Sequence, residues 1–251
     1  MGEEDPEDAA TRHYLLARAH LLLGNPGLAL EEIRKALALE EESGHKAYGT
    51  PLVEGQALLQ LGRYEEAMAS FREALARADA GERPHVLHEM GVAALDHGAY
   101  PEAEEHLRAL VREEGYPYLA QAYADLAEAL YRQGRYQEAE AAAREAVARG
   151  AVAAGELVLG HVAYDLLHLE EALEHYRKAA ESAEEGSREW VGAQEMVVDT
   201  LAQLGYRFPE EMVRRGQAVL PYLHPADEWH AALTAYVERA QALLREGKRL
   251  N

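Results

Sequence analysis

The chain contains no cysteine, which excludes disulfides, thiolate metal sites and cysteine nucleophiles. β-branched aliphatic residues are also scarce, and Ile33 is the only isoleucine. Alanine, leucine, glutamate and arginine dominate instead, and such a composition favours helix almost throughout. The length of 251 residues fits one large domain or two small ones.

Basic residues are few, since 25 lysines and arginines face 45 carboxylates and the formal net charge is −20. This balance argues against nucleic acid and anionic membrane surfaces as partners, because both would be repelled. The most apolar stretch, around residues 21–30, is interrupted by Gly24 and Pro26 and is too short to cross a membrane. The acidic start of the chain lacks the basic and apolar regions of a signal peptide. We therefore expect a cytoplasmic protein.

A short pattern recurs along the chain: glycine, any residue, an aromatic residue or proline, and alanine three positions later. It is clear at 62–67, 98–103 and 134–139, and weaker at 24–29 and 167–172. A small residue precedes each alanine by twelve positions. The alanines are Ala29, Ala67, Ala103, Ala139 and Ala172, and the small residues are Ala17, Gly55, Gly91, Ala127 and Gly160.

These linked positions predict a helical hairpin stacked on copies of itself. Small residues at matched sites let the two helices of a hairpin approach closely, and the glycine ends the first helix in a left-handed turn. Carboxylates such as Glu66, Glu102 and Glu138 fall in the first turn of the second helix, where negative charge suits the helix dipole.

The pattern resembles the tetratricopeptide repeat (TPR) family, whose 34-residue motif has a small residue at position 8, glycine at 15, tyrosine at 17 and alanine at 20 and 27. The resemblance implies an all-α fold, a right-handed superhelix (α-solenoid) with five clear repeats, a degenerate sixth and a C-terminal capping helix. First helices are expected at about 10–23, 48–61, 84–97, 120–133 and 153–166. Second helices are expected at about 27–40, 65–78, 101–113, 137–149 and 170–183.

The expected domain organisation follows the same register. An acidic tail occupies 1–9, and the five repeats occupy 10–43, 48–81, 84–117, 120–153 and 153–186. The degenerate repeat covers 187–225, and the capping helix covers 226–251 with an apolar stripe of Trp229, Leu233, Tyr236, Ala240 and Leu243. Two departures are notable: about four extra residues lie near 44–47, and Leu167 replaces the turn glycine, so that turn is expected to be less regular.

Nothing in the sequence indicates catalysis. His85 and His88 are three residues apart and could share a metal, but no third ligand is placed beside them, so solvated histidines are the simpler interpretation. No phosphate-binding loop or nucleophile motif is present, and the carboxylates are typical of solvated helix faces paired with arginine. We expect a non-enzymatic protein with no metal and no cofactor.

In the family, first helices line a concave groove that binds extended peptides or partner helices. Carried onto this chain, the groove positions mix tyrosines with charges and amides, which favours a binding surface over a merely solvated wall. The clamp with which chaperone-binding members hold a terminal carboxylate is not reproduced. The expected groove residues are Tyr14, Arg18, Gln56, His85, His88, Gln121, Glu128, Tyr131, Arg132, His161, Tyr164, Asp165, Glu195 and Asp199.

The charge of the groove in the later repeats indicates what kind of segment the groove binds. From repeat 4 onward, four groove carboxylates face one arginine, which favours a basic or amine-bearing segment. The expected function is a protein–protein interaction scaffold that binds a peptide or partner segment in its groove. Two alternatives remain open: a regulatory protein that senses a peptide, and a self-assembling oligomer joined through its terminal repeats.

Overall fold

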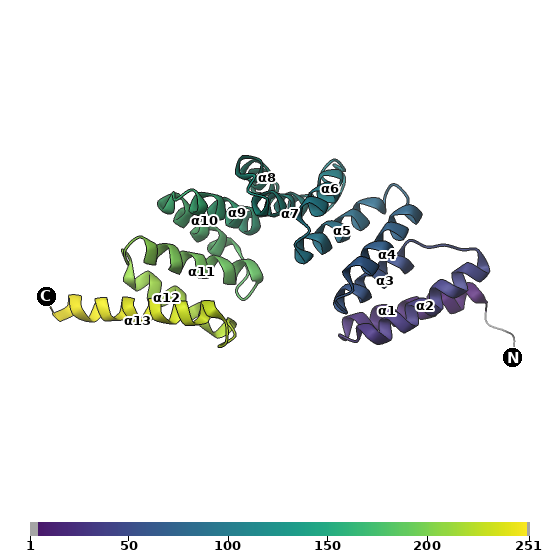
Figure 1. Ribbon diagram of the computed structural model, residues 1–251, viewed down its shortest axis with the longest axis horizontal. Helices are drawn as coiled ribbons and strands as arrows, with labels where there is room; N and C mark the ends of the chain where they lie inside the picture. Colours follow the sequence, from purple (N-terminus) through teal and green to yellow (C-terminus); the bar gives the residue numbers. More distant parts are fainter. Residues whose placement is uncertain (1–4, 250–251) are drawn as a thin grey trace. The chain divides into compact units, whose positions relative to one another are not determined.

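The computed structural model describes residues 5–249, and within them the chain forms thirteen α-helices, one short 3-10 turn and no strand (Figure 1). The chain divides into two compact units, residues 1–116 and 117–251, which are described separately. None of the helices in the described part combines the length and the apolar character needed to cross a bilayer.

Unit 1 contains three helical hairpins. The first helices are α1 (Pro6–Leu22), α3 (Gly49–Gln60) and α5 (Arg83–His97), and the second helices are α2 (Pro26–Ser43), α4 (Tyr64–Arg77) and α6 (Tyr100–Leu110).

Unit 2 contains three further hairpins and a final helix. The first helices are α7 (Leu119–Arg132), α9 (Val152–Asp165) and α11 (Arg188–Gln203). The second helices are α8 (Tyr136–Arg149), α10 (Leu169–Ser182) and α12 (Pro209–Val219). A 3-10 turn (Leu220–Tyr222) leads to α13 (Glu228–Arg249).

The first helix begins four residues before the expected start, inside the segment assigned to an acidic tail. The side chain of Asp5 accepts a hydrogen bond of 3.0 Å from the backbone N–H of Glu7, and Pro6 occupies the first helical position. Both features favour a helix start. Ala9 is buried, so residues 6–9 belong to the first hairpin and not to a tail.

The turns between paired helices share one backbone conformation. The glycines at positions 24, 62, 98 and 134 have φ between 70° and 79°. Leu167 takes the same place in the fifth hairpin with φ of 62°, and its N–H donates to the carbonyl of Tyr164 at 2.9 Å. The turn that was expected to be irregular therefore keeps the left-handed geometry, although leucine adopts it less readily than glycine.

The cores of the hairpins are built by pairing a small residue on the first helix with a large one on the second. A Cβ atom added at Gly55 would lie 2.4 Å from the ring of Phe71, and one added at Gly160 would lie 2.5 Å from the ring of Tyr176. Gly91 faces Leu107 in the same way, whereas Ala127 in the fourth hairpin is matched by Ala143. The size of each small residue is therefore set by the residue opposite it.

The final helix packs on α11 and α12 mainly through the expected stripe, since Leu233 and Ala240 lie in the core and Tyr236 packs against it. Leu233, Val237 and Ala240 are buried, at 0%, 5% and 0% exposure. Trp229, which was expected in this stripe, is 43% exposed, so its assignment to the buried face is wrong. The buried face also includes Val237, which the predicted stripe omitted and which lies directly against Gly216 on α12.

Candidate binding surface

The first helices of unit 2 contact one another directly: α7 contacts α9, α9 contacts α11, and α11 contacts α13. We call the surface formed by α7, α9 and α11 the first-helix wall. It carries nine of the expected groove residues because their spacing places them on one face of each helix. They are Gln121, Glu128, Tyr131, Arg132, His161, Tyr164, Asp165, Glu195 and Asp199.

Tyrosine–carboxylate hydrogen bonds join successive helices along this wall. The hydroxyl of Tyr164 on α9 donates to Asp199 on α11, and Asp199 is only 5% exposed. The hydroxyl of Tyr136, at the start of α8, donates to Asp165 on α9 at 3.2 Å. Burial and the neighbouring Asp165 raise the pKa of Tyr131 to about 12, so this phenol stays protonated and able to donate.

Asp199 therefore has a different role from the one expected. Its carboxylate lies inside the protein and accepts from Tyr164, and it lies close enough to Tyr236 on α13 for a second such bond. A buried carboxylate that accepts a hydrogen bond from a phenol stabilises the contact between α9 and α11. It does not present a free charge to a partner, and this corrects its assignment to the exposed groove.

His161 lies at the centre of an aromatic cluster. Its ring stacks on Tyr131 at 5.5 Å between centroids, and its Nδ1 shares a hydrogen bond of 2.9 Å with the Tyr176 hydroxyl. Burial lowers the pKa of His161, which outweighs the opposing influence of Glu128 and Asp165. The imidazole is therefore neutral at pH 7 and serves as a hydrogen-bond partner inside the wall.

This cluster predicts a pH dependence of stability. Because the folded-state pKa of His161 lies below its ordinary value, the unfolded chain binds the proton first as the pH falls through about 6.5. The melting temperature should thus fall between pH 7.5 and pH 5.5, and it should fall less in His161→Gln. Melting curves at both pH values measure this difference. The exposed His224→Gln serves as control, and an equal loss in all three proteins would contradict the prediction.

Among the expected groove residues of this wall, four charged groups are not buried, and three of the four are acidic. Glu128 is paired with Arg132 in the same helix, with 2.7 Å between Oε1 and Nε. Asp165 is exposed at the end of α9, and Glu195 on α11 is half-buried. Burial and the nearby Asp227 raise the pKa of Glu195, as expected for a carboxylate without a cationic neighbour.

The other five expected groove residues lie in unit 1 and do not form a comparable network. Arg18 lies over the ring of Tyr14, 5.7 Å from its centroid, and His88 shares a hydrogen bond of 2.8 Å with Tyr116. Gln56 is half-buried, and His85 is exposed. Within residues 5–249, no group of three or more histidine or acidic side chains is arranged to hold a metal ion.

Unit 1 also contains a cavity of about 550 Å³ beside the lengthened connection between α2 and α3. Tyr14, Tyr48 and Glu82 contribute to its lining, and burial with Glu82 nearby raises the pKa of Tyr48. The extra residues near 44–47 were noticed in the sequence, but nothing in their types indicates a cavity. The tyrosine–carboxylate pairs were also missed as pairs, because they join residues 29 to 35 positions apart.

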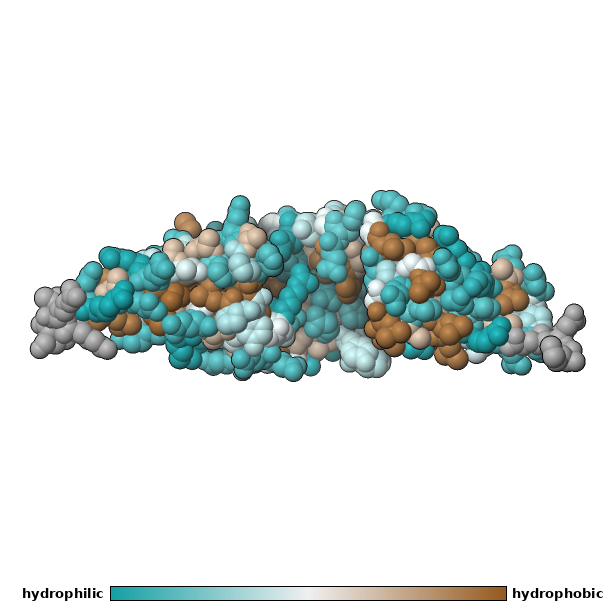
Figure 2. Space-filling view, turned by 90° about the horizontal axis from the view of Figure 1, so that it is seen from below, coloured by the Kyte–Doolittle hydropathy of each residue, from teal (hydrophilic) through white to brown (hydrophobic). Residues whose placement is uncertain are grey.

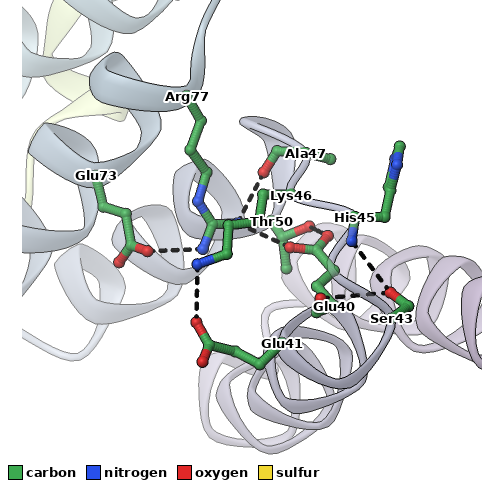
Figure 3. Close-up of polar contacts among 9 residues, drawn as sticks. All are labelled: Glu40, Glu41, Ser43, His45, Lys46, Ala47, Thr50, Glu73 and Arg77. Carbon is green, nitrogen blue, oxygen red and sulfur yellow. Dashed lines mark hydrogen bonds and ion pairs between the residues drawn. The ribbon is translucent and has the colours of Figure 1, made fainter.

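Arg77 and Glu40 line this cavity and form an ion pair whose side chains are almost completely buried. Figure 3 shows the guanidinium of Arg77 reaching Glu40 at 2.8 Å, Glu73 at 2.6 Å and the carbonyl of Ala47 at 3.1 Å. The hydroxyl of Thr50 donates to the other oxygen of Glu40. These bonds join α2, α3, α4 and the lengthened connection, so the cluster holds the second hairpin against the first.

Repeated helical hairpins with matched small residues and left-handed turns define a helical repeat protein. Three models of the tetratricopeptide repeat match the sequence, at residues 6–35, 53–80 and 88–154. The chain is a member of the tetratricopeptide repeat family. No curated protein matches the chain by sequence.

Solved structures agree with this fold. The chain is similar to PilF of Pseudomonas aeruginosa, with 16% identity, a TM-score of 0.70 and coverage of 92% of this chain and 99% of that chain. It is similar to MamA of Desulfovibrio magneticus, with 23% identity, a TM-score of 0.60 and coverage of 70% of this chain and 95% of that chain. It is also similar to TTC0263 of Thermus thermophilus, with 22% identity, a TM-score of 0.56 and coverage of 78% of this chain and 100% of that chain. The fold is one that protein-interaction scaffolds use, and proteins of this family are generally non-enzymatic.

Proposed function

We propose that the protein is a non-enzymatic scaffold that binds a basic segment of a partner protein along the first-helix wall of unit 2. The observation that carries the proposal is the placement of Glu128, Asp165 and Glu195 on three successive helices that contact one another. Such a row of carboxylates attracts lysine and arginine side chains spaced along an extended peptide.

The aromatic cluster supports the same proposal. Tyr131 is half-buried, and its ring stacks on His161. A tyrosine held by such a contact offers contact area at little entropic cost, and the guanidinium of Arg132, 6.0 Å from the ring centroid, already occupies the kind of position that a cation takes beside this ring. The hydrogen bonds behind the wall keep this surface ordered before a partner arrives, which lowers the cost of binding.

The proposal predicts which changes weaken binding. Selection of peptides from a random displayed library on the immobilised full chain should enrich sequences with two or more lysines or arginines. Tyr131→Ala should lower the affinity for the selected peptides at least tenfold, because it removes the central contact. Asp165→Asn should slow their association and flatten its dependence on salt. Titration calorimetry and stopped-flow fluorescence measure the two effects.

A control comes from the second helices of the same unit. Glu174 is exposed on α10, and Glu174→Gln changes the net charge exactly as Asp165→Asn does. The control should leave affinity and association rate unchanged. The proposed site would be wrong if the selected peptides lacked basic residues, or if Glu174→Gln reduced their affinity as much as the changes on the first-helix wall.

A further inference from the structure

The first helix of the protein exposes an apolar face. Leucine side chains on α1 and at the start of α2 are strongly exposed: Leu15 55%, Leu16 43%, Leu22 87%, Leu23 73% and Leu28 47%. Figure 2 shows hydrophobic residues gathered on the part of unit 1 where α1 and α2 lie. Together these leucines expose on the order of 500 Å², a patch size that marks interaction sites on soluble proteins.

One edge of this face is covered by another helix in the third hairpin, whereas Leu15, Leu22 and Leu23 correspond in the repeat register to the polar residues Glu89, Asp96 and His97. Leu16 and Ala19 of α1 correspond in the repeat register to Met90 and Ala93 of α5, which are 1% and 4% exposed. Met90 and Ala93 belong to the core that α5 shares with the preceding hairpin. On α1, Leu16 and Ala19 have no preceding hairpin within the described residues to cover them. Their surface is therefore shaped for contact with a helix.

The distribution of charge along the chain indicates which helix covers this face of α1. Residues 9–30 contain no aspartate or glutamate, although 45 of the 251 residues are acidic. Two copies of a chain with a net charge of −20 repel each other over most of their surfaces. The face of α1 between Thr11 and Leu23 is a place where two copies can meet without bringing carboxylates together.

We propose that this face joins two copies of the chain, with α1 of one copy packed antiparallel to α1 of the other. The helix has 17 residues and is about 25 Å long. If Leu15 of each copy faces Ala19 of the other, the small alanine leaves room for the leucine at both symmetric positions. Arg12 then lies near Leu22 at the C-terminal end of the opposite helix, where the helix dipole favours a cation.

The size of the contact is sufficient for a specific pair. Two such patches bury on the order of 1,000 Å² together, which is the lower end for specific interfaces. The pairing uses unit 1 alone, and it is independent of peptide binding by unit 2. Its failure and the failure of the proposed function are therefore separate outcomes.

Sedimentation of the full chain over a range of concentrations tests the proposal. The wild-type chain should form a dimer, and the double variant Leu15→Glu/Leu22→Glu should raise its dissociation constant at least tenfold. Both leucines are exposed, so the fold should survive, as circular dichroism checks; the milder Leu22→Ala should weaken the dimer less. Leu166→Glu, directly after α9 at a leucine that is 46% exposed, should leave the dimer intact. A wild-type monomer, or a dimer that the double variant leaves unchanged, would overturn the proposal.

Crosslinking tests the antiparallel register, and the absence of native cysteines makes it specific. An equimolar mixture of Leu15→Cys and Ala19→Cys chains should form a disulfide-linked pair under mild oxidation, because these positions face each other across the interface. Neither variant alone should crosslink comparably. Efficient crosslinking of each variant with itself and not in the mixture would indicate a parallel arrangement and overturn the proposed one.

Discussion

Replacing Arg77 by methionine should lower the free energy of unfolding by about 3–5 kcal/mol. The side chains of Arg77 and Glu40 are 8% and 6% exposed, so the substitution leaves a carboxylate enclosed without its cation. Glu40 would keep only the hydroxyl of Thr50 as a donor, while the carbonyl of Ala47 would lose its partner as well. Chemical denaturation followed by circular dichroism measures the loss.

Two further variants distinguish the effect of breaking the buried ion pair from the general effect of removing a charge. Arg72 lies on the same helix and contacts Glu102 at 3.2 Å, but its side chain is 57% exposed. Arg72→Ala should therefore cost no more than about 1 kcal/mol. Adding Glu40→Gln to Arg77→Met should recover part of the loss, because an amide is less costly to bury than a carboxylate. Equal effects of Arg72→Ala and Arg77→Met would show that burial does not decide the outcome.

The repeat register could be predicted closely from the sequence. The expected bounds of the helices from α2 to α10 lie within three residues of those observed, because each repeat fixes its turn and its helix contacts with the same few residues. The start of α1 was placed four residues too late. Its beginning depends on a local cap at Asp5 and on Pro6, and neither belongs to the repeating pattern.

The candidate site could be predicted less well, since its chemistry depends on pairs across helices. The register correctly places Asp199 on α11, but only packing shows that Tyr164 and α13 enclose it. Periodicity likewise places Leu233 and Ala240 on the buried stripe of α13, but it does not show where the covered part of the stripe ends, so Trp229 was included and Val237 was omitted. The pattern of a sequence indicates which face of a helix is buried more readily than it indicates which other helix covers that face.

Replacing Tyr176 by alanine should cost about 3–5 kcal/mol, comparable with the loss expected for Arg77→Met. Tyr176 is fully buried and fills the space left by Gly160 on the facing helix. Its hydroxyl is also the hydrogen-bond partner of His161, at 2.9 Å. Truncation therefore opens a cavity in the fifth hairpin and leaves the imidazole nitrogen without that partner.

The space opened by Tyr176→Ala should reverse the effect of a second substitution, Gly160→Ala. Alanine is favoured over glycine within a helix by about 1 kcal/mol, but in the wild-type chain its Cβ would lie 2.5 Å from the tyrosine ring. Gly160→Ala alone should thus destabilise the protein, because overpacking of this kind costs about 1–3 kcal/mol.

In the Tyr176→Ala background, the same change should stabilise the protein and reproduce the alanine pair of the fourth hairpin, Ala127 and Ala143. Gly192 on α11, where an added Cβ would lie 3.8 Å from the side chain of Leu157, provides the control. Gly192→Ala should stabilise the protein in both backgrounds. Unfolding free energies of the four members of the cycle should give a coupling of about 1–3 kcal/mol between positions 160 and 176. Additive effects would mean that the small residue of the repeat is not selected by the ring opposite it.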